Sequence, residues 1–187
     1  METWLLVVVV VLLVLVLAAL VAPRAVRGWR SQRIRKRFGP EYDRTVSRTG
    51  DRAAAEAELA EREKRRCRLT ITDLDPAARD RYLQGWRAAQ ARFVDNPVAA
   101  TREADLLVTN VMRDRGYPVD DFEQQAADVS VDHPTVVEHY RSAHAVAVAT
   151  EREQVSTEDL RQAITHYRAL FDELVGAGET ESGGRHG

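Results

Sequence analysis

The sequence is poor in cysteine and in aromatic residues. Cys67 is the only cysteine among 187 residues, so the chain cannot form an intrachain disulfide or build a metal site on several thiolates. Nothing in this usage indicates that the fold needs an oxidising compartment. Aromatic residues make up 6% of the chain. This content is low for an enzyme with a large core, and it is sufficient for a small helical bundle.

Sequence motifs of the common catalytic and cofactor sites are also missing. The chain has no glycine-rich phosphate loop, no HExxH, no CxxC and no calcium-loop pattern. A serine nucleophile elbow is missing as well. The sequence therefore predicts no cofactor and no metal, and it gives no positive sign of an enzyme. The length leaves room for one domain of ordinary size and an anchor.

The one long hydrophobic run lies near the amino terminus, from Leu5 to Ala22. Its 18 residues include no polar side chain. As a helix they would extend about 27 Å, close to the hydrocarbon thickness of a bilayer. A cleaved signal peptide is the alternative, but residues 1–3 carry no Lys or Arg, and Pro23 follows the best cleavage position. We therefore expect a single uncleaved transmembrane helix within residues 1–23.

A basic segment follows the hydrophobic run, whereas the amino-terminal side carries no Lys or Arg. Because an excess of Lys and Arg marks the cytoplasmic side, the amino terminus is expected outside and the soluble domain in the cytoplasm. These cations would also contact anionic lipid headgroups, at about 1 kcal/mol each; the alternative is that they only fix the orientation. Nucleic-acid binding is not favoured, because no nucleic-acid-binding fold accompanies the segment. The expected lipid-contacting residues, which include one interfacial tryptophan, are Trp4, Arg24, Arg27, Arg30, Arg33, Arg35, Lys36 and Arg37.

The net charge of −2 conceals two regions of opposite sign. Residues 24–68 hold 15 Arg and Lys against 7 Asp and Glu, a balance of +8. Residues 69–175 hold 11 against 19, a balance of −8. The first region predicts a basic neck that lies against the bilayer. The second predicts an acidic domain that suits a basic protein partner or the basic neck of a second copy; alternatively, its charge only keeps the domain soluble.

Within the neck, the stretch from Asp51 to Arg68 is rich in Ala, Glu and Arg, and Leu59 is its only large apolar residue before Leu69. A helix this polar is typical of a stalk, or of a helix that packs along a single edge. Residues 69–72 are expected to form an extended linker. The predicted fold is all-α, with a transmembrane helix at 1–23, a charged helical neck at 24–68, a bundle of about five helices at 69–175 and a disordered tail at 176–187.

The first two bundle helices have clear start signals. Asp75-Pro76 and Asn96-Pro97 each predict an N-cap followed by proline in the first helical turn. Gly116 predicts the end of the second helix, because glycine readily adopts the left-handed conformation found after a helix. The expected apolar stripes of these helices are Tyr82, Trp86, Ala89 and Phe93 in the first, and Ala100, Ala104, Leu107, Val108, Val111 and Met112 in the second.

Three more helices are expected after Gly116. One covers Val119–Val129, the next is capped by Asp132, and the last begins at a capping box that starts with Ser156. Each carries apolar residues at helical spacing. The stripes of the last two helices are Val137, Tyr140, His144 and Val148, and Leu160, Ile164, Tyr167, Phe171 and Leu174.

Histidine and tyrosine supply the few candidates for chemistry. His144, His166 and Tyr140 lie on the last two helices and are weak candidates for a catalytic site assembled between them. Packing is the alternative role for the two histidines. His133 and His144 share a helix face but are about 16 Å apart along its axis, too far to bind one metal ion. Trp86 lies on an apolar stripe, which favours a core position over stacking on a nucleotide.

Five segments of the chain carry a resemblance to other proteins: RFGPEYDR (37–44), RYLQGWRAAQARFVDNP (81–97), RGYPVDDFE (115–123), SVDHP (130–134) and TEDLRQAITHYRALFDEL (157–174). Together they resemble a family of uncharacterised short bacterial proteins, often with one N-terminal membrane helix and usually labelled hypothetical or secreted. The resemblance extends over nearly all of the chain after the anchor. It implies no activity and no site residues, and a secreted location would conflict with the charges that flank the anchor.

These features together predict a membrane-tethered helical interaction module, an adapter or scaffold, on the cytoplasmic face. The alternative is an enzyme or small-molecule sensor whose site is assembled between helices. A deep polar pocket would favour the alternative. A shallow surface with an exposed apolar or acidic patch would favour the interaction module.

Overall fold

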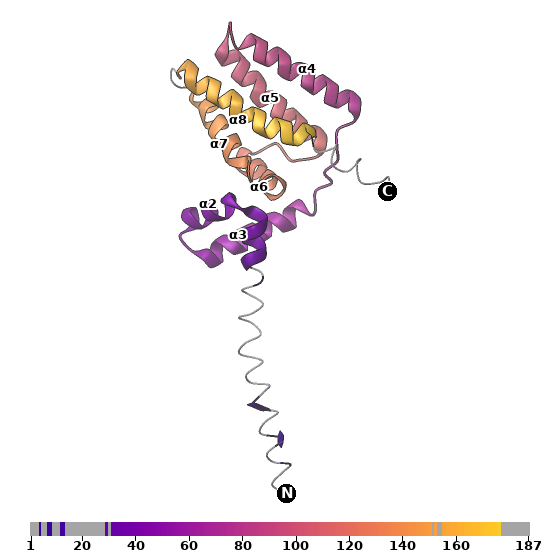
Figure 1. Ribbon diagram of the computed structural model, residues 1–187, viewed down its shortest axis with the longest axis vertical. Helices are drawn as coiled ribbons and strands as arrows, with labels where there is room; N and C mark the ends of the chain where they lie inside the picture. Colours follow the sequence, from indigo (N-terminus) through magenta and orange to yellow (C-terminus); the bar gives the residue numbers. More distant parts are fainter. Residues whose placement is uncertain are drawn as a thin grey trace. The chain divides into compact units, whose positions relative to one another are not determined.

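The computed structural model describes residues 31–150, 152 and 155–176, together with Trp4, Val7, Val8, Leu12, Leu13 and Trp29. The chain divides into two compact units, residues 1–37 and 38–187 (Figure 1). The described residues form helices and connections without a strand. The predicted all-α class is therefore confirmed for this part of the chain.

In the first unit, residues 31–37 are helical. The predicted anchor, Leu5–Ala22, lies outside the described residues except for Val7, Val8, Leu12 and Leu13. None of the helices described has the length and hydrophobicity required to cross a membrane. The predicted tail also falls outside the described residues, from position 177 onward.

The second unit begins with a hairpin of two helices, α2 (Pro40–Thr49) and α3 (Arg52–Arg66). Gly39, with φ 47°, precedes α2, and Pro40 occupies its first turn. Asp51 caps α3 by accepting hydrogen bonds from two backbone N–H groups at 3.0 and 3.3 Å. The α3 helix buries Leu59 along one edge. Of the two expectations for this polar helix, the structure therefore bears out the helix packed along an edge.

Five helices follow, as predicted: α4 (Pro76–Arg92), α5 (Pro97–Arg115), α6 (Phe122–Asp132), α7 (Val137–Ala149) and α8 (Thr157–Gly176). The caps predicted for α4 and α5 are confirmed, because Asp75 accepts from a backbone N–H at 2.8 Å and Asn96 does so at 3.0 Å. Ser156 likewise accepts from the backbone N–H of Asp159 at 3.1 Å at the start of α8. Figure 1 shows α8 alongside α5 and α7, with α4 against α5.

Two details of the predicted helices are wrong. The third bundle helix begins at Phe122 and not at Val119, because Asp121 is its N-cap and accepts from the N–H of Gln124 at 2.8 Å. Asp132 does not cap the next helix. It is the last residue of α6, and α7 starts at Val137 without a side-chain cap. The carboxylate of Asp132 is instead bound by Arg66 and Tyr117.

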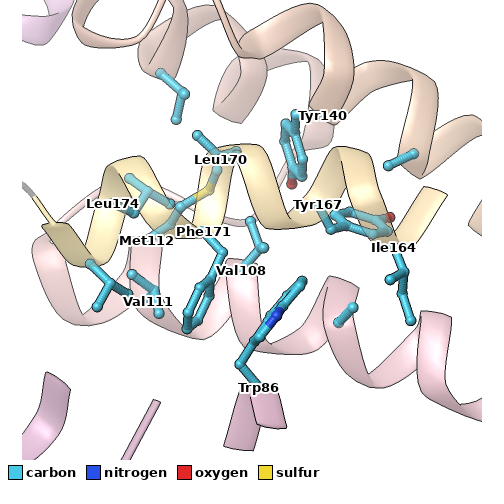
Figure 2. Close-up of a cluster of buried hydrophobic side chains, with 14 of the residues drawn as sticks. Trp86, Val108, Val111, Met112, Tyr140, Ile164, Tyr167, Leu170, Phe171 and Leu174 are labelled. Carbon is cyan, nitrogen blue, oxygen red and sulfur yellow. The ribbon is translucent and has the colours of Figure 1, made fainter. Parts of the chain in front are cut away.

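A single apolar cluster joins α4, α5, α6, α7 and α8. Trp86 of α4 stacks on Phe171 of α8, with ring centroids 4.6 Å apart (Figure 2). Trp86 is 3% exposed, so its predicted core position is confirmed. All five residues of the predicted α8 stripe are buried. Within the part of the chain that the structure describes, no residue of α2 or α3 belongs to this cluster.

The connection between α3 and α4 is held against the end of α5. The N–H of Thr72 donates to the carbonyl of Arg115 at 2.9 Å, and the Arg115 side chain donates to the carbonyl of Leu174 at 2.8 Å, near the carboxyl end of α8. Gly116 has φ 97°, as expected for the residue after a helix, and a Cβ there would lie 2.4 Å from the carbonyl oxygen of Thr70. Glycine at this position therefore permits both the turn and the close approach of the connection.

Candidate functional site

Two of the three catalytic candidates lie close together. Tyr140 is buried, and its ring lies 6.4 Å from that of half-buried His144, centroid to centroid. Asp105 of α5 lies beside His144: its Oδ1 is 3.6 Å from Nδ1 of His144 and accepts a hydrogen bond from the hydroxyl of Tyr167 at 2.8 Å. The ring of Phe122 stacks on His144 at 3.7 Å between centroids. The group thus joins residues of α5, α6, α7 and α8.

The geometry of this group favours packing over catalysis. A separation of 3.6 Å is too long for a hydrogen bond, and Nδ1 of His144 is buried without a hydrogen-bond partner among the described residues. Burial, together with the charge of Asp105, raises the pKa of Tyr140 and of Tyr167. Both phenols therefore stay protonated at neutral pH and cannot act as bases there.

The third candidate, His166, does not join them. Its ring lies 4.7 Å from that of His139, centroid to centroid, and burial with the nearby imidazole of His139 lowers its pKa. His139 is exposed and His166 is half-buried, as expected for the packing alternative. Among the residues described, no group of three or more His, Cys, Asp or Glu side chains is arranged to hold a metal ion.

A charged cavity of about 350 Å³ lies where α2, α3, α6 and α7 meet. Sequence reasoning did not identify it. All of its lining residues except Ala127 are charged or polar: Arg44, Arg48, Glu58, Arg62, Arg65, Asp121, Glu123, Gln124 and Arg141. The cavity therefore concentrates five arginines in one place on a unit whose helices α4–α8 are acidic overall.

Glu41 of α2 is the centre of this arrangement and is 1% exposed. Arg141 of α7 binds it with two hydrogen bonds, of 2.7 and 2.9 Å, and Arg62 of α3 adds a third of 2.6 Å. Arg62 also donates to Ser130 of α6 at 3.2 Å. One buried carboxylate thus ties together residues of four helices that lie up to 100 positions apart in the sequence.

Further ion pairs surround this centre. Arg44 pairs with Glu138 at 2.8 Å, and Arg65 pairs with the buried Asp128 at 3.5 Å. Within the hairpin, Glu58 accepts from Arg48 at 2.5 Å and from Arg62 at 2.6 Å. Each of the five arginines therefore faces a carboxylate. With Asp121 and Glu123 included, six carboxylates outnumber five guanidinium groups among the described residues, so the cavity carries no positive excess that would attract a free anion.

The electrostatics of the cavity fit charge recognition better than proton transfer. Burial raises the pKa of Glu41, but the hydrogen bonds and charges of Arg141 and Arg62 outweigh it, and the net shift is downward. The pKa of Glu58 is also lowered, because Arg62 and Arg48 outweigh its burial. Both carboxylates are therefore ionised at neutral pH. A general acid or base needs a pKa near the working pH, and these groups lack it.

Sequence reasoning missed this cluster because its partners are far apart in the chain. A local signal did exist: Glu41 follows Pro40 in the first turn of α2, where a carboxylate is favoured by the helix dipole. An exposed carboxylate in the first turn would give the same signal, so the sequence does not show that Glu41 is buried. Only the fold shows that Glu41 is buried between Arg62 and Arg141.

In the first unit, four of the predicted lipid-contacting residues lie on the helical segment 31–37 and are exposed: Arg33, Arg35, Lys36 and Arg37. Trp4 is also exposed, whereas Arg24, Arg27 and Arg30 lie outside the described residues. One residue was missed. Trp29 is 81% exposed and lines a hollow of about 480 Å³ with Gln32, Arg33, Lys36 and Arg37. Its spacing from these cations, four, seven and eight positions, is a one-sided helical pattern that the sequence already contained.

No protein family, no curated protein and no solved structure matches the chain. The resemblance to short bacterial proteins with one membrane helix therefore stays a prediction.

Proposed function

We propose that the chain is a membrane-tethered interaction module. In this proposal the run from Leu5 to Ala22 crosses the membrane, the basic segment that follows contacts anionic lipid headgroups, and the helical unit faces the cytoplasm and binds a protein partner. Trp29 adds support to the lipid contact, because an exposed tryptophan beside three cations is typical of a membrane–water interface.

One observation favours binding over catalysis: Glu41 and Glu58, at the cavity between α2, α3, α6 and α7, are paired with arginines that lower the pKa of both carboxyl groups, so both stay ionised at neutral pH. Carboxylates that stay ionised do not exchange protons with a substrate. The excess of acidic residues in 69–175 fits a basic partner.

The proposed orientation can be tested with the native thiol. Cys67 is the only cysteine and is exposed, so it reports which side of the membrane the helical unit occupies. A membrane-impermeant maleimide should leave Cys67 unlabelled in intact cells and label it after lysis. Labelling of equal extent before and after lysis would place the helical unit outside the cell.

The proposed binding activity can be tested by capture from the native membrane. The tagged full-length chain should retain a defined protein, and the same tag on residues 1–37 alone is the matched control. A partner that is retained only by the full-length chain would support the proposal. Equal recovery on both baits would show that the helical unit captures nothing, and the interaction function would then be wrong.

A site at Asp105 and His144 is the second candidate, favoured by the approach of the Asp105 carboxylate to Nδ1 of His144. If a bound ligand brings this carboxylate within hydrogen-bond distance of Nδ1, it would orient the imidazole to act as a base. Chemical-shift titration of His144 with metabolite extracts is the relevant measurement. A ligand that perturbs His144, and that loses its effect in Asp105→Asn, would favour this alternative.

A further inference from the structure

The face of α6 that the hairpin covers contains two carboxylates, Asp128 and Asp132, and residues outside the hairpin hold both of them in place. Gln124 donates to both oxygens of Asp128 at 2.9 Å, and the hydroxyl of Tyr117 donates to Asp132 at 2.7 Å. These contacts do not involve α2 or α3. The two acceptors are therefore held in place whether or not the hairpin is docked.

The hairpin supplies the arginines that these acceptors bind. Arg65 of α3 pairs with Asp128, and Arg66 binds Asp132 while its guanidinium carbon lies 5.8 Å from the centre of the Tyr117 ring. A carboxylate beside an aromatic face suits arginine better than lysine, because the planar guanidinium stacks and forms paired hydrogen bonds. The face of α6 is thus built to bind an arginine-bearing helix.

Another helix that forms the same contacts could take the place of α3 on α6. Among the described residues, neither α2 nor α3 contributes to the apolar cluster of α4–α8, and the connection from residue 67 to 75 contains no helix. Ion pairs join α3 to α6 in addition to the burial of Leu59, and an ion pair is equally available to any chain that presents the same charges at the same spacing.

We propose that the acidic face of α6 is the docking surface for an arginine-bearing helix of a partner protein, and that α3 covers this face in the free chain. The proposal rests on the proposed interaction function for the existence of such a partner. The partner presents two adjacent arginines, as α3 does at positions 65 and 66. The hairpin then acts as a cover that the partner displaces.

The test uses the full-length chain in detergent and a labelled peptide with the sequence of residues 52–68, in which serine replaces Cys67. Arg65→Asp with Arg66→Asp places acidic side chains of α3 against Asp128 and Asp132, which should release the hairpin. Amide hydrogen exchange should show lost protection in α2 and α3, with α5 and α8 unchanged. The peptide should bind this variant about tenfold or more tightly than it binds the wild-type chain.

Two further variants make the result specific. Arg161→Asp with Arg168→Asp makes the same change of charge on exposed residues of α8, and it should leave both peptide affinity and exchange at wild-type values. Adding Asp128→Arg and Asp132→Arg to the released variant should abolish peptide binding and restore protection of α3, because the reversed charges again attract. A peptide with lysine at both arginine positions should bind more weakly.

Either of two results would overturn the proposal. If α2 and α3 keep their protection in this variant, the ion pairs of Arg65 and Arg66 do not hold the cover. If they lose protection and the peptide still does not bind, the face of α6 is not a docking surface. The proposed function fails separately: peptide binding with no partner captured from the native membrane would leave the surface established and the interaction function without support.

Discussion

The α2–α3 hairpin and the α4–α8 bundle belong to one compact unit, but different interactions stabilise each of them. The bundle buries a continuous apolar cluster in which Trp86 and Phe171 stack. The hairpin buries Tyr42 and Leu59 outside that cluster, and Glu41 and Arg62 of the hairpin form buried ion pairs, the first with Arg141 of α7. Apolar burial is favourable regardless of the exact partner, whereas a buried charge is tolerated only while its counter-charge is present. We therefore expect the hairpin to be more sensitive than the bundle to the loss of a single charged side chain.

The largest effect is expected from a change in the bundle. Trp86→Ala should lower the free energy of unfolding by about 3–5 kcal/mol, because it removes a large aromatic side chain that is almost fully buried. Chemical denaturation followed by circular dichroism measures this value.

Trp86→Phe is the matched control for this prediction. It keeps a ring that can contact Phe171 and removes the indole N–H, which has no hydrogen-bond partner in the described structure. Its cost should be well below that of alanine. Equal losses for alanine and phenylalanine would show that the lost packing volume is not what destabilises the bundle.

The next largest effect is expected from Glu41→Gln, and it should be local. Removal of the carboxylate leaves the buried Arg62 and Arg141 with only the more exposed Glu58 and Glu138 as counter-charges, which costs about 3 kcal/mol by comparison with other broken buried pairs. Because the hairpin is outside the apolar cluster, amide exchange should speed up in α2 and α3 and stay slow in α5 and α8. A uniform increase over all helices would mean that hairpin and bundle unfold as one.

Local interactions could be predicted from the sequence, whereas contacts between residues far apart in the chain could not. The five bundle helices follow from local signals, such as Asp75-Pro76 at a helix start and the stripe that contains Phe171, and the structure confirms them. The position of α3 could not be predicted from local signals. Leu59 is one apolar residue on a polar helix, and the residues of α6 that α3 contacts, Asp128 and Ser130, lie far along the chain.

The charged cavity was beyond sequence reasoning for the same reason. Arg62 is 21 positions and Arg141 is 100 positions from Glu41, and neither pairing has a periodic pattern that would reveal it. The separation into +8 and −8 regions predicted only that the acidic domain suits a basic partner or the basic neck of a second copy, with solubility as the alternative. It did not show which residues pair. Asp132 illustrates the limit, since a helix-cap position and a long-range ion pair look alike in the sequence.

As the pH falls, we expect stability to be lost first around His133 in the bundle and then around Glu41 in the hairpin. Burial lowers the pKa of His133, which lies where α6 meets α7, against the opposing effect of Glu173. A lowered histidine pKa means that the fold favours the neutral ring, so stability is lost as the pH falls below the unfolded value of 6.5. The lowered pKa of Glu41 acts at lower pH. Its contribution is complete above 4.5 and is lost as the pH falls through the folded pKa.

Amide exchange between pH 7 and 3, corrected for intrinsic rates, would measure this order. A modest loss of protection around His133 is expected first, and release of α2 and α3 is expected only below about pH 4.5. Glu41→Gln should remove most of the second step, because it has no carboxylate to protonate. Release of the hairpin near pH 6 would contradict the role assigned to Glu41.

The smallest effect is expected from an ion pair of the hairpin that solvent reaches. Arg48 and Glu58 are 2.5 Å apart, but their side chains are 51% and 34% exposed, so water and salt screen the pair. Arg48→Ala should change the stability of the hairpin by about 0.5 kcal/mol or less, and amide exchange in α2 and α3 should stay close to wild type. Arg62→Ala is the informative counterpart, because Arg62 also binds Glu58 but is buried and contacts Glu41. A large effect of Arg48→Ala and a small one of Arg62→Ala would mean that the surface pairs, and not the buried carboxylate, keep the hairpin docked.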